Sequence, residues 1–216
     1  IDTRNLDDIN KVNRVKLAEE IWDNIEQKIV NLPRYSEFKE IFTFDIKQLL
    51  NSLHHSYIIN INPYMINLKE AEIHANHNMT FYLYSDIDLM SSLEFDIKDL
   101  PHLREIIWRA QQMARIGNWL STWEREIEEG DFSSGIFAYA VTHEILDVEH
   151  LNDKNTDELL DLLKNSVIEE HFLEKWQKNY NQIKYLSPKV KSIDINQYLE
   201  GLEQILSFHL ASKGLK

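Results

Sequence analysis

The stretch RIGNWLSTWEREIEEGD, from Arg115 to Asp131, decides the fold of this chain. It closes a segment that contains no helix breaker between Pro101 and Gly130. Proline is favoured in the first turn of a helix, and glycine is favoured just after the last turn. The spacing therefore predicts one long, unbroken helix over about 101–129, and its apolar content places that helix at the centre of a bundle.

The rest of the chain repeats the helical pattern. Apolar side chains recur every three or four residues, and the 216 residues include only 5 Gly and 4 Pro. No alternating strand pattern and no internal repeat is visible. The sequence thus predicts an all-α fold of about seven helices in a single domain, 1–216. The predicted helices cover about 12–29, 38–57, 67–90, 101–129, 134–150, 156–187 and 194–212.

Composition excludes several classes of protein. The formal net charge of -13 repels phosphate backbones, so nucleic acid is a poor partner. The absence of cysteine excludes disulfides and cysteine-type zinc sites, and it suits the cytoplasm, where we expect the protein. No apolar run approaches the roughly 20 residues of a transmembrane helix, and no signal peptide is visible.

Three oxygen-bearing side chains share one face of the predicted central helix. Asn118, Thr122 and Glu126 follow one another at intervals of four residues, and each step of four turns the side chain by only about 40°. An amide, a hydroxyl and a carboxylate oxygen suit a hard cation such as Mg²⁺. One carboxylate holds Mg²⁺ weakly, so the site makes sense where a diphosphate supplies further anionic ligands. A solvated helix face is the alternative reading of the same spacing.

The surrounding residues resemble the second metal-binding motif of class I terpene synthases, the Asn/Ser/Glu triad. In that family a basic residue commonly precedes the glutamate, as Arg125 does here, and a Gly-Asp pair commonly closes the helix, as Gly130 and Asp131 do. Arg115 and Gly117 are also similar to the family pattern. The resemblance is specific over about 104–136 and looser elsewhere. It implies the isoprenoid-synthase helical bundle as the fold.

The resemblance also implies an activity. It predicts a lyase that ionises a linear prenyl diphosphate with Mg²⁺, three ions binding together with the substrate diphosphate, and then cyclises or rearranges the carbocation. Asn118, Thr122 and Glu126 would hold metal, and Arg125 would bind diphosphate. Trp119, which neighbours the triad, and Phe81 are candidates for the lining of the substrate pocket, because aromatic faces stabilise cations.

The sequence departs from the family in three places. The family's aspartate-rich motif is not evident, and we expect it on helices that precede Ile1; Asp7-Asp8 is a weaker candidate, read more simply as a helix cap. No arginine lies between Pro63 and Met90, where the family senses diphosphate. The C-terminal Arg-Tyr pair is replaced by His209 and Lys213. A trans-prenyltransferase and a non-catalytic helical protein that binds a lipid or a partner stay open as alternatives, as does a homodimer.

Overall fold

The computed structural model describes residues 9–153 and 156–214 and is helical throughout, with no strand in this part of the chain. Residues Asp7 and Asp8 lie outside it. Short 3₁₀ segments, including Ala75–Met79, connect some of the helices. The α-helices are α1 (Ile9–Ile29), α2 (Tyr35–Ile61), α3 (Leu68–His74), α4 (Phe81–Ser91), α5 (Leu100–Glu129), α6 (Gly135–Thr142), α7 (Val148–Asp153), α8 (Thr156–Lys164), α9 (Ile168–Leu186) and α10 (Ile195–Ala211).

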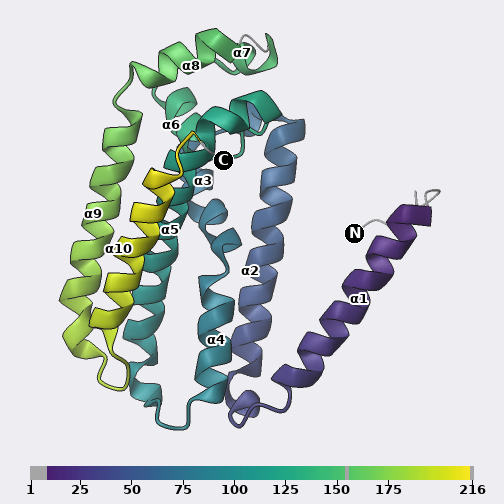
Figure 1. Ribbon diagram of the computed structural model, residues 1–216, viewed down its shortest axis with the longest axis vertical. Coiled ribbons are helices and arrows are strands. Elements are labelled where there is room, and N and C mark those ends of the chain that lie inside the picture. Colours follow the sequence, from purple (N-terminus) through teal and green to yellow (C-terminus); the bar gives the residue numbers. More distant parts are fainter. Residues whose placement is uncertain (1–8, 154–155, 215–216) are drawn as a thin grey trace.

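Helix α5 is the central element of the fold (Figure 1). Helices α9 and α10 pack against one side of it, while α4 and the 3₁₀ segment 75–79 pack against another. Helix α2 covers α4 and the 3₁₀ segment, and the short helices α6, α7 and α8 lie across the end at which α5 finishes (Figure 1). The all-α class and the central position of α5 are therefore as the sequence predicts.

The bounds of α5 follow from local chemistry. Gly130 adopts a left-handed conformation with φ 69°, and its N–H approaches the carbonyl oxygens of Glu126 and Ile127, which ends the helix. Asp99 precedes the first turn, but its carboxylate accepts hydrogen bonds from the backbone N–H groups of Lys191 and Ser192. These bonds fasten the connection between α9 and α10 to the beginning of α5.

Three of the predicted helices are each divided in two. The predicted helix 67–90 consists of α3 and α4 with the 3₁₀ segment between them, because Thr80 has φ 61° and interrupts the helical path. The predicted helix 134–150 breaks at Glu144, which has φ 57°. The predicted helix 156–187 is interrupted near Ser166, whose hydroxyl bonds the carbonyl oxygen of Leu163 instead. The count of seven helices was therefore wrong, because polar residues offer the backbone local alternatives to the helix.

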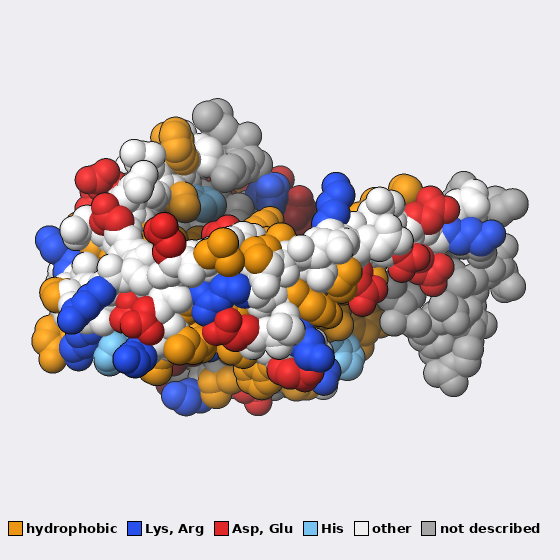
Figure 2. All heavy atoms as spheres, turned by 90° about the horizontal axis from the view of Figure 1, so that it is seen from below, with side chains coloured by type: hydrophobic (Ala, Val, Ile, Leu, Met, Phe, Trp, Pro, Cys, Tyr) orange, Lys and Arg blue, Asp and Glu red, His pale blue; other side chains and the backbone are white. Residues whose placement is uncertain are grey.

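Helix α1 extends away from the rest of the bundle (Figures 1 and 2). Its apolar side chains Leu17, Ile21, Trp22 and Ile25 are 40–56% exposed, whereas Ile29 at its end is buried. In Figure 2 this projecting arm carries hydrophobic, acidic and basic side chains side by side. No helix of the described residues is long and apolar enough to cross a bilayer.

Candidate functional site

The three oxygen-bearing residues lie on the last three turns of α5 and face the protein interior. Thr122 and Glu126 are buried, with 3% and 8% of their surface exposed, and Asn118 is half-buried. The reading of this spacing as a solvated helix face is therefore wrong for Thr122 and Glu126. Because α6 and α8 pack around this part of α5, the triad lies below a covered end of the bundle.

Hydrogen bonds connect the three members of the triad. The hydroxyl oxygen of Thr122 lies 2.7 Å from Oε1 of Glu126 and 2.8 Å from the backbone carbonyl oxygen of Asn118. A hydroxyl carries one proton, so it donates to only one of these acceptors at a time. The other carboxylate oxygen of Glu126, Oε2, is buried without a hydrogen bond of standard geometry, although the Ser134 hydroxyl lies close enough to act on Glu126 and to lower its pKa. Burial raises the pKa of Glu126, against the smaller opposing effects of Thr122 and Arg115.

Arg115 joins the triad one turn before Asn118. Its guanidinium donates a hydrogen bond of 2.9 Å to Oδ1 of Asn118, while its Nε is buried without a partner. Desolvation lowers the pKa of this guanidinium, although the charges of Glu126 and Asp131 act in the opposite direction. Positive charge is thus held inside the protein beside the single carboxylate of the triad.

Asp131 connects the triad end of α5 to α2. Its carboxylate accepts hydrogen bonds from the Asn60 side chain at 2.9 Å and from the Ser133 hydroxyl at 2.7 Å. Burial acts to raise the pKa of Asp131, but these bonds and the charge of Arg115 outweigh it, so the pKa is lowered. We call Arg115, Asn118, Thr122, Glu126 and Asp131 the triad cluster.

Trp119 follows Asn118 in the sequence and Arg125 precedes Glu126, and these two residues have different surroundings. Arg125 is partly exposed, and its Nε lies 3.1 Å from Oε1 of Glu129, one turn further along α5. Trp119 is buried in the core, where its ring lies 5.4 Å from that of Phe172 and 5.3 Å from the guanidinium carbon of Arg115. Trp119 therefore packs behind the triad cluster.

The donor set of the triad cluster fits a hard cation that brings ligands of its own. Neighbouring ligands around Mg²⁺ lie about 3.0 Å apart when its bonds of about 2.1 Å meet at right angles. The Thr122 and Glu126 oxygens, at 2.7 Å, are near this separation, and Oε2 of Glu126 is free of hydrogen bonds. Within the described residues, no group of three or more His, Asp or Glu side chains is placed to hold a metal. A cation here would need anionic ligands from a bound molecule.

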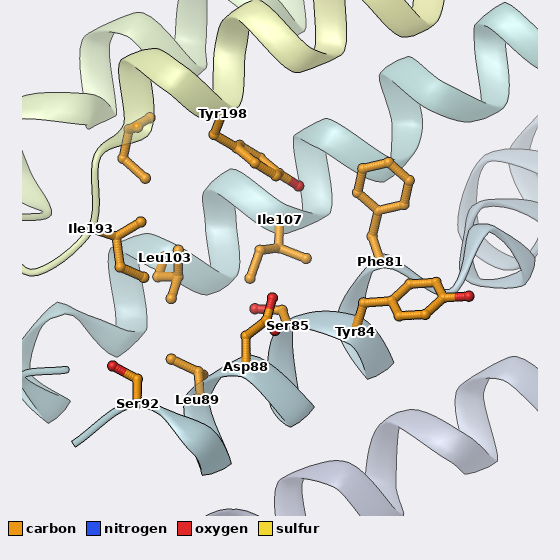
Figure 3. Close-up of a pocket in the computed structure, with 11 residues that line it drawn as sticks. Phe81, Tyr84, Ser85, Asp88, Leu89, Ser92, Leu103, Ile107, Ile193 and Tyr198 are labelled. Carbon is orange, nitrogen blue, oxygen red and sulfur yellow. The ribbon is translucent and has the colours of Figure 1, made fainter. Parts of the chain in front are cut away.

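An apolar cleft opens further down α5, between α4 and α10 (Figure 3). Its volume is about 430 Å³, and Phe81 is among its lining residues. The close-up shows Phe81, Asp88 and Tyr198 directed towards a common space above Ile107. We call this the α4–α10 cleft, and its lining residues are Phe81, Tyr84, Ser85, Asp88, Leu89, Ser92, Leu103, Ile107, Ile193, Ile195 and Tyr198.

The cleft and the triad cluster are related through the geometry of α5. Ile107 and Asn118 are separated by eleven residues, which make almost three full turns, so both lie on one side of the helix. The rise between them is about 16 Å. Arg125 lies on the same side, five full turns above Ile107. One side of α5 thus presents apolar residues at the bottom and polar residues near the top.

Sequence reasoning missed several members of these two sites. Arg115 and Asp131 were noted only as part of the family pattern, although their spacing from the triad on α5 could have indicated a shared cluster. Asn60 and Tyr198 carry no sequence signal, because they come from distant helices. Asp88 could have been found as an acidic residue within the apolar pattern of α4.

Comparison of this chain with protein-family models, with curated proteins and with solved structures gave no match. The resemblance to class I terpene synthases therefore rests on the residues of the central helix. The all-helical architecture is consistent with that family's fold class but is shared by many others. The triad cluster and the α4–α10 cleft are the two features from which a function can be argued.

Proposed function

We propose that this protein is a Mg²⁺-dependent class I terpene synthase, a lyase that ionises a linear prenyl diphosphate and rearranges the carbocation to a terpene. The observation that carries the proposal is the buried carboxylate of Glu126. Its Oε2 forms no hydrogen bond of standard geometry, its Oε1 lies 2.7 Å from the Thr122 hydroxyl, and the positive charge of Arg115 acts on it. A buried carboxylate with an unpartnered oxygen is costly, and such a group is commonly explained by a ligand or an ion.

In this proposal the triad residues bind metal, and two arginines bind diphosphate. Asn118, Thr122 and Glu126 would hold one Mg²⁺, which when bound with the diphosphate supplies Lewis-acid assistance to the leaving group. Arg115 has a buried Nε without a partner, and it is suited to donate hydrogen bonds to diphosphate oxygens. Arg125, on the same side of α5 as Asn118, would add a second positive charge at the more exposed edge of the site.

The α4–α10 cleft supports the same proposal from the substrate's side. An apolar chain attached to the diphosphate requires a water-poor space. The cleft lies on the side of α5 that carries Asn118, about 16 Å lower along the helix. Phe81, which the resemblance suggested for the pocket, lines this cleft, whereas Trp119 does not.

A non-catalytic lipid-binding protein is the second candidate. The observation in its favour is that Arg125 is paired with Glu129 and that Asn118 already accepts a hydrogen bond from Arg115. A triad that is satisfied in this way could be a structural network above an apolar cleft. A trans-prenyltransferase of the same fold differs from the first proposal in product, so the same assay separates them.

The test is turnover of geranyl, farnesyl and geranylgeranyl diphosphate by the full natural protein, with Mg²⁺ or with EDTA. We expect hydrocarbon products and released diphosphate only with Mg²⁺. Longer prenyl diphosphates, formed in the presence of isopentenyl diphosphate, would indicate the trans-prenyltransferase instead. If none of these substrates is turned over, the non-catalytic lipid-binding protein is the remaining candidate.

A matched pair of variants assigns the site. Glu126→Gln keeps size and removes charge, and we expect it to reduce diphosphate release by about 100-fold or more, since the metal loses its only charged protein ligand. Glu128→Gln makes the same chemical change two residues away at an exposed position and should behave like the wild type. Equal damage by the two substitutions would show that the triad is not the site.

A further inference from the structure

The α4–α10 cleft combines an apolar lining with one carboxylate. Its floor is formed by buried Leu89, Leu103 and Ile107. Asp88 stands at the open rim, and its side chain points into the space between α4 and α10 (Figure 3). Burial of its inner side raises the pKa of Asp88, and no other cause contributes. The cleft therefore carries one carboxylate at its rim.

Both walls of the cleft carry aromatic side chains, although the Tyr84 ring points away from Asp88. Phe81 and Tyr84 come from the beginning of α4, and Tyr198 comes from α10 on the opposite wall (Figure 3). Burial and the negative charge of Asp88 together raise the pKa of Tyr198, so the carboxylate and the phenol lie within electrostatic reach. Faces of aromatic rings and a carboxylate both attract positive charge.

We propose that the α4–α10 cleft binds the positively charged centre of an otherwise apolar molecule, with Asp88 as the counter-charge. The apolar walls exclude an inorganic cation or a polar metabolite, which would lose water without enough replacement. The carboxylate disfavours a neutral hydrocarbon and repels an anion. A volume of about 430 Å³ suits a molecule of small-ligand size.

One consequence rests on the proposed function. In a prenyl diphosphate lyase, the positive charge would come to lie in the cleft, remote from the diphosphate, because Ile107 is about 16 Å below Asn118 along α5. Asp88 would then determine where the charge is stabilised, and so which product forms. It would act after the ionisation step, which takes place at the triad cluster.

The binding test does not require turnover. Titration calorimetry of the full natural protein would compare decyltrimethylammonium, 1-decanol and decyl sulfate, each below its critical micelle concentration or solubility limit. We expect the ammonium to bind about tenfold more tightly than the alcohol, and the sulfate to bind most weakly. Asp88→Asn should bring the ammonium and the alcohol to equal affinity. Glu94→Gln, which removes one exposed charge outside the cleft, should leave the preference intact.

Two further outcomes separate this inference from the proposed function. Ser85→Trp should block binding of all three probes, because it fills the cleft from α4; unchanged binding would place the probes elsewhere and overturn the inference. In a turnover assay, Asp88→Asn should change the product distribution. Absence of turnover with an intact ammonium preference would refute the lyase and leave the cation site standing. An ammonium affinity no greater than that of the alcohol, or unaffected by Asp88→Asn, would refute the cation site.

Discussion

The two ends of α5 differ in polarity and in how openly their side chains are surrounded. Near its C-terminal end, the triad cluster brings together five polar or charged side chains that are buried or half-buried, and two of their polar atoms, Nε of Arg115 and Oε2 of Glu126, form no hydrogen bond of standard geometry. Near its N-terminal end, the α4–α10 cleft places apolar side chains around an open space with one carboxylate at the rim. The closed end is rich in polar groups, and the open end is poor in them.

This difference indicates where each half tolerates change. Buried polar groups are costly unless they are satisfied, so the triad cluster should depend on close packing and on each hydrogen bond. The cleft has room, so substitutions there should alter binding more than stability. The predictions below test this contrast, from the largest expected effect to the smallest.

The strongest test of packing at the closed end is Gly135→Ala. A Cβ atom at this position would lie 2.4 Å from Cζ3 of Trp119, which is fully enclosed beside Arg115. We expect a loss of about 2–3 kcal/mol in the free energy of unfolding, measured in urea, because the ring has to move. Gly201→Ala on α10 meets nothing within 4 Å and should be neutral or stabilising by up to about 1 kcal/mol. Similar effects of the two substitutions would contradict close packing around Trp119.

A second prediction concerns buried charge in the lower half of the bundle, away from the cleft lining. Arg104 forms a two-fold hydrogen-bonded pair with Asp45, and buried Asp86 lies 3.8 Å from Arg104. Burial, together with the charge of Asp45, raises the pKa of Asp86 to about 8. The folded protein therefore keeps the Asp86 proton up to that pH, whereas the unfolded chain releases it near pH 4.

The sign of the pH dependence follows from these values. The contribution of Asp86 to stability is fully present below about pH 4 and is lost as the pH rises towards 8. Asp86→Asn has no such proton, so we expect the advantage of the wild type over this variant to shrink by about 2 kcal/mol between pH 6 and pH 8. Asp161→Asn, at an exposed position on α8, is the control and should show no such trend. A flat difference for Asp86→Asn would mean that the group is ionised in the folded protein.

A third prediction ranks the neutral members of the triad. Asn118→Ala and Thr122→Ala each remove an uncharged oxygen, and we expect each to lower diphosphate release about tenfold, less than Glu126→Gln does. Thr122→Ser keeps the hydroxyl that lies beside Glu126 and should retain most of the activity. If Thr122→Ser is as damaging as Thr122→Ala, the methyl group matters through packing, and the hydroxyl is not a ligand.

The smallest effect is expected at the exposed edge of the closed end. Arg125→Ala removes a charge and an ion pair with Glu129, so stability should change by less than about 0.5 kcal/mol. The KM for the prenyl diphosphate should rise several-fold if the side chain contacts diphosphate. Glu129→Ala releases Arg125 from its partner and should leave the KM unchanged or lower. An unchanged KM in Arg125→Ala would restrict diphosphate binding to Arg115.

Local sequence determined the helical class and the central helix. The run from Pro101 to Gly130 has its stop signal in its own residues, and the interval of four between Asn118, Thr122 and Glu126 places them on one side of any regular helix. The same local rules were wrong at Thr80 and Glu144, where the backbone takes a left-handed conformation that helical periodicity does not reveal.

Tertiary structure decided everything that joins distant segments. Only folding brings Asn60 of α2 to Asp131, and only folding sets Tyr198 of α10 opposite Asp88 of α4. The spacing along one helix cannot tell whether its polar face meets solvent or other helices, because burial depends on which elements pack above it. That packing left Oε2 of Glu126 buried without a hydrogen bond of standard geometry and kept the cleft open about five turns below, and these two facts carry the proposals made for this protein.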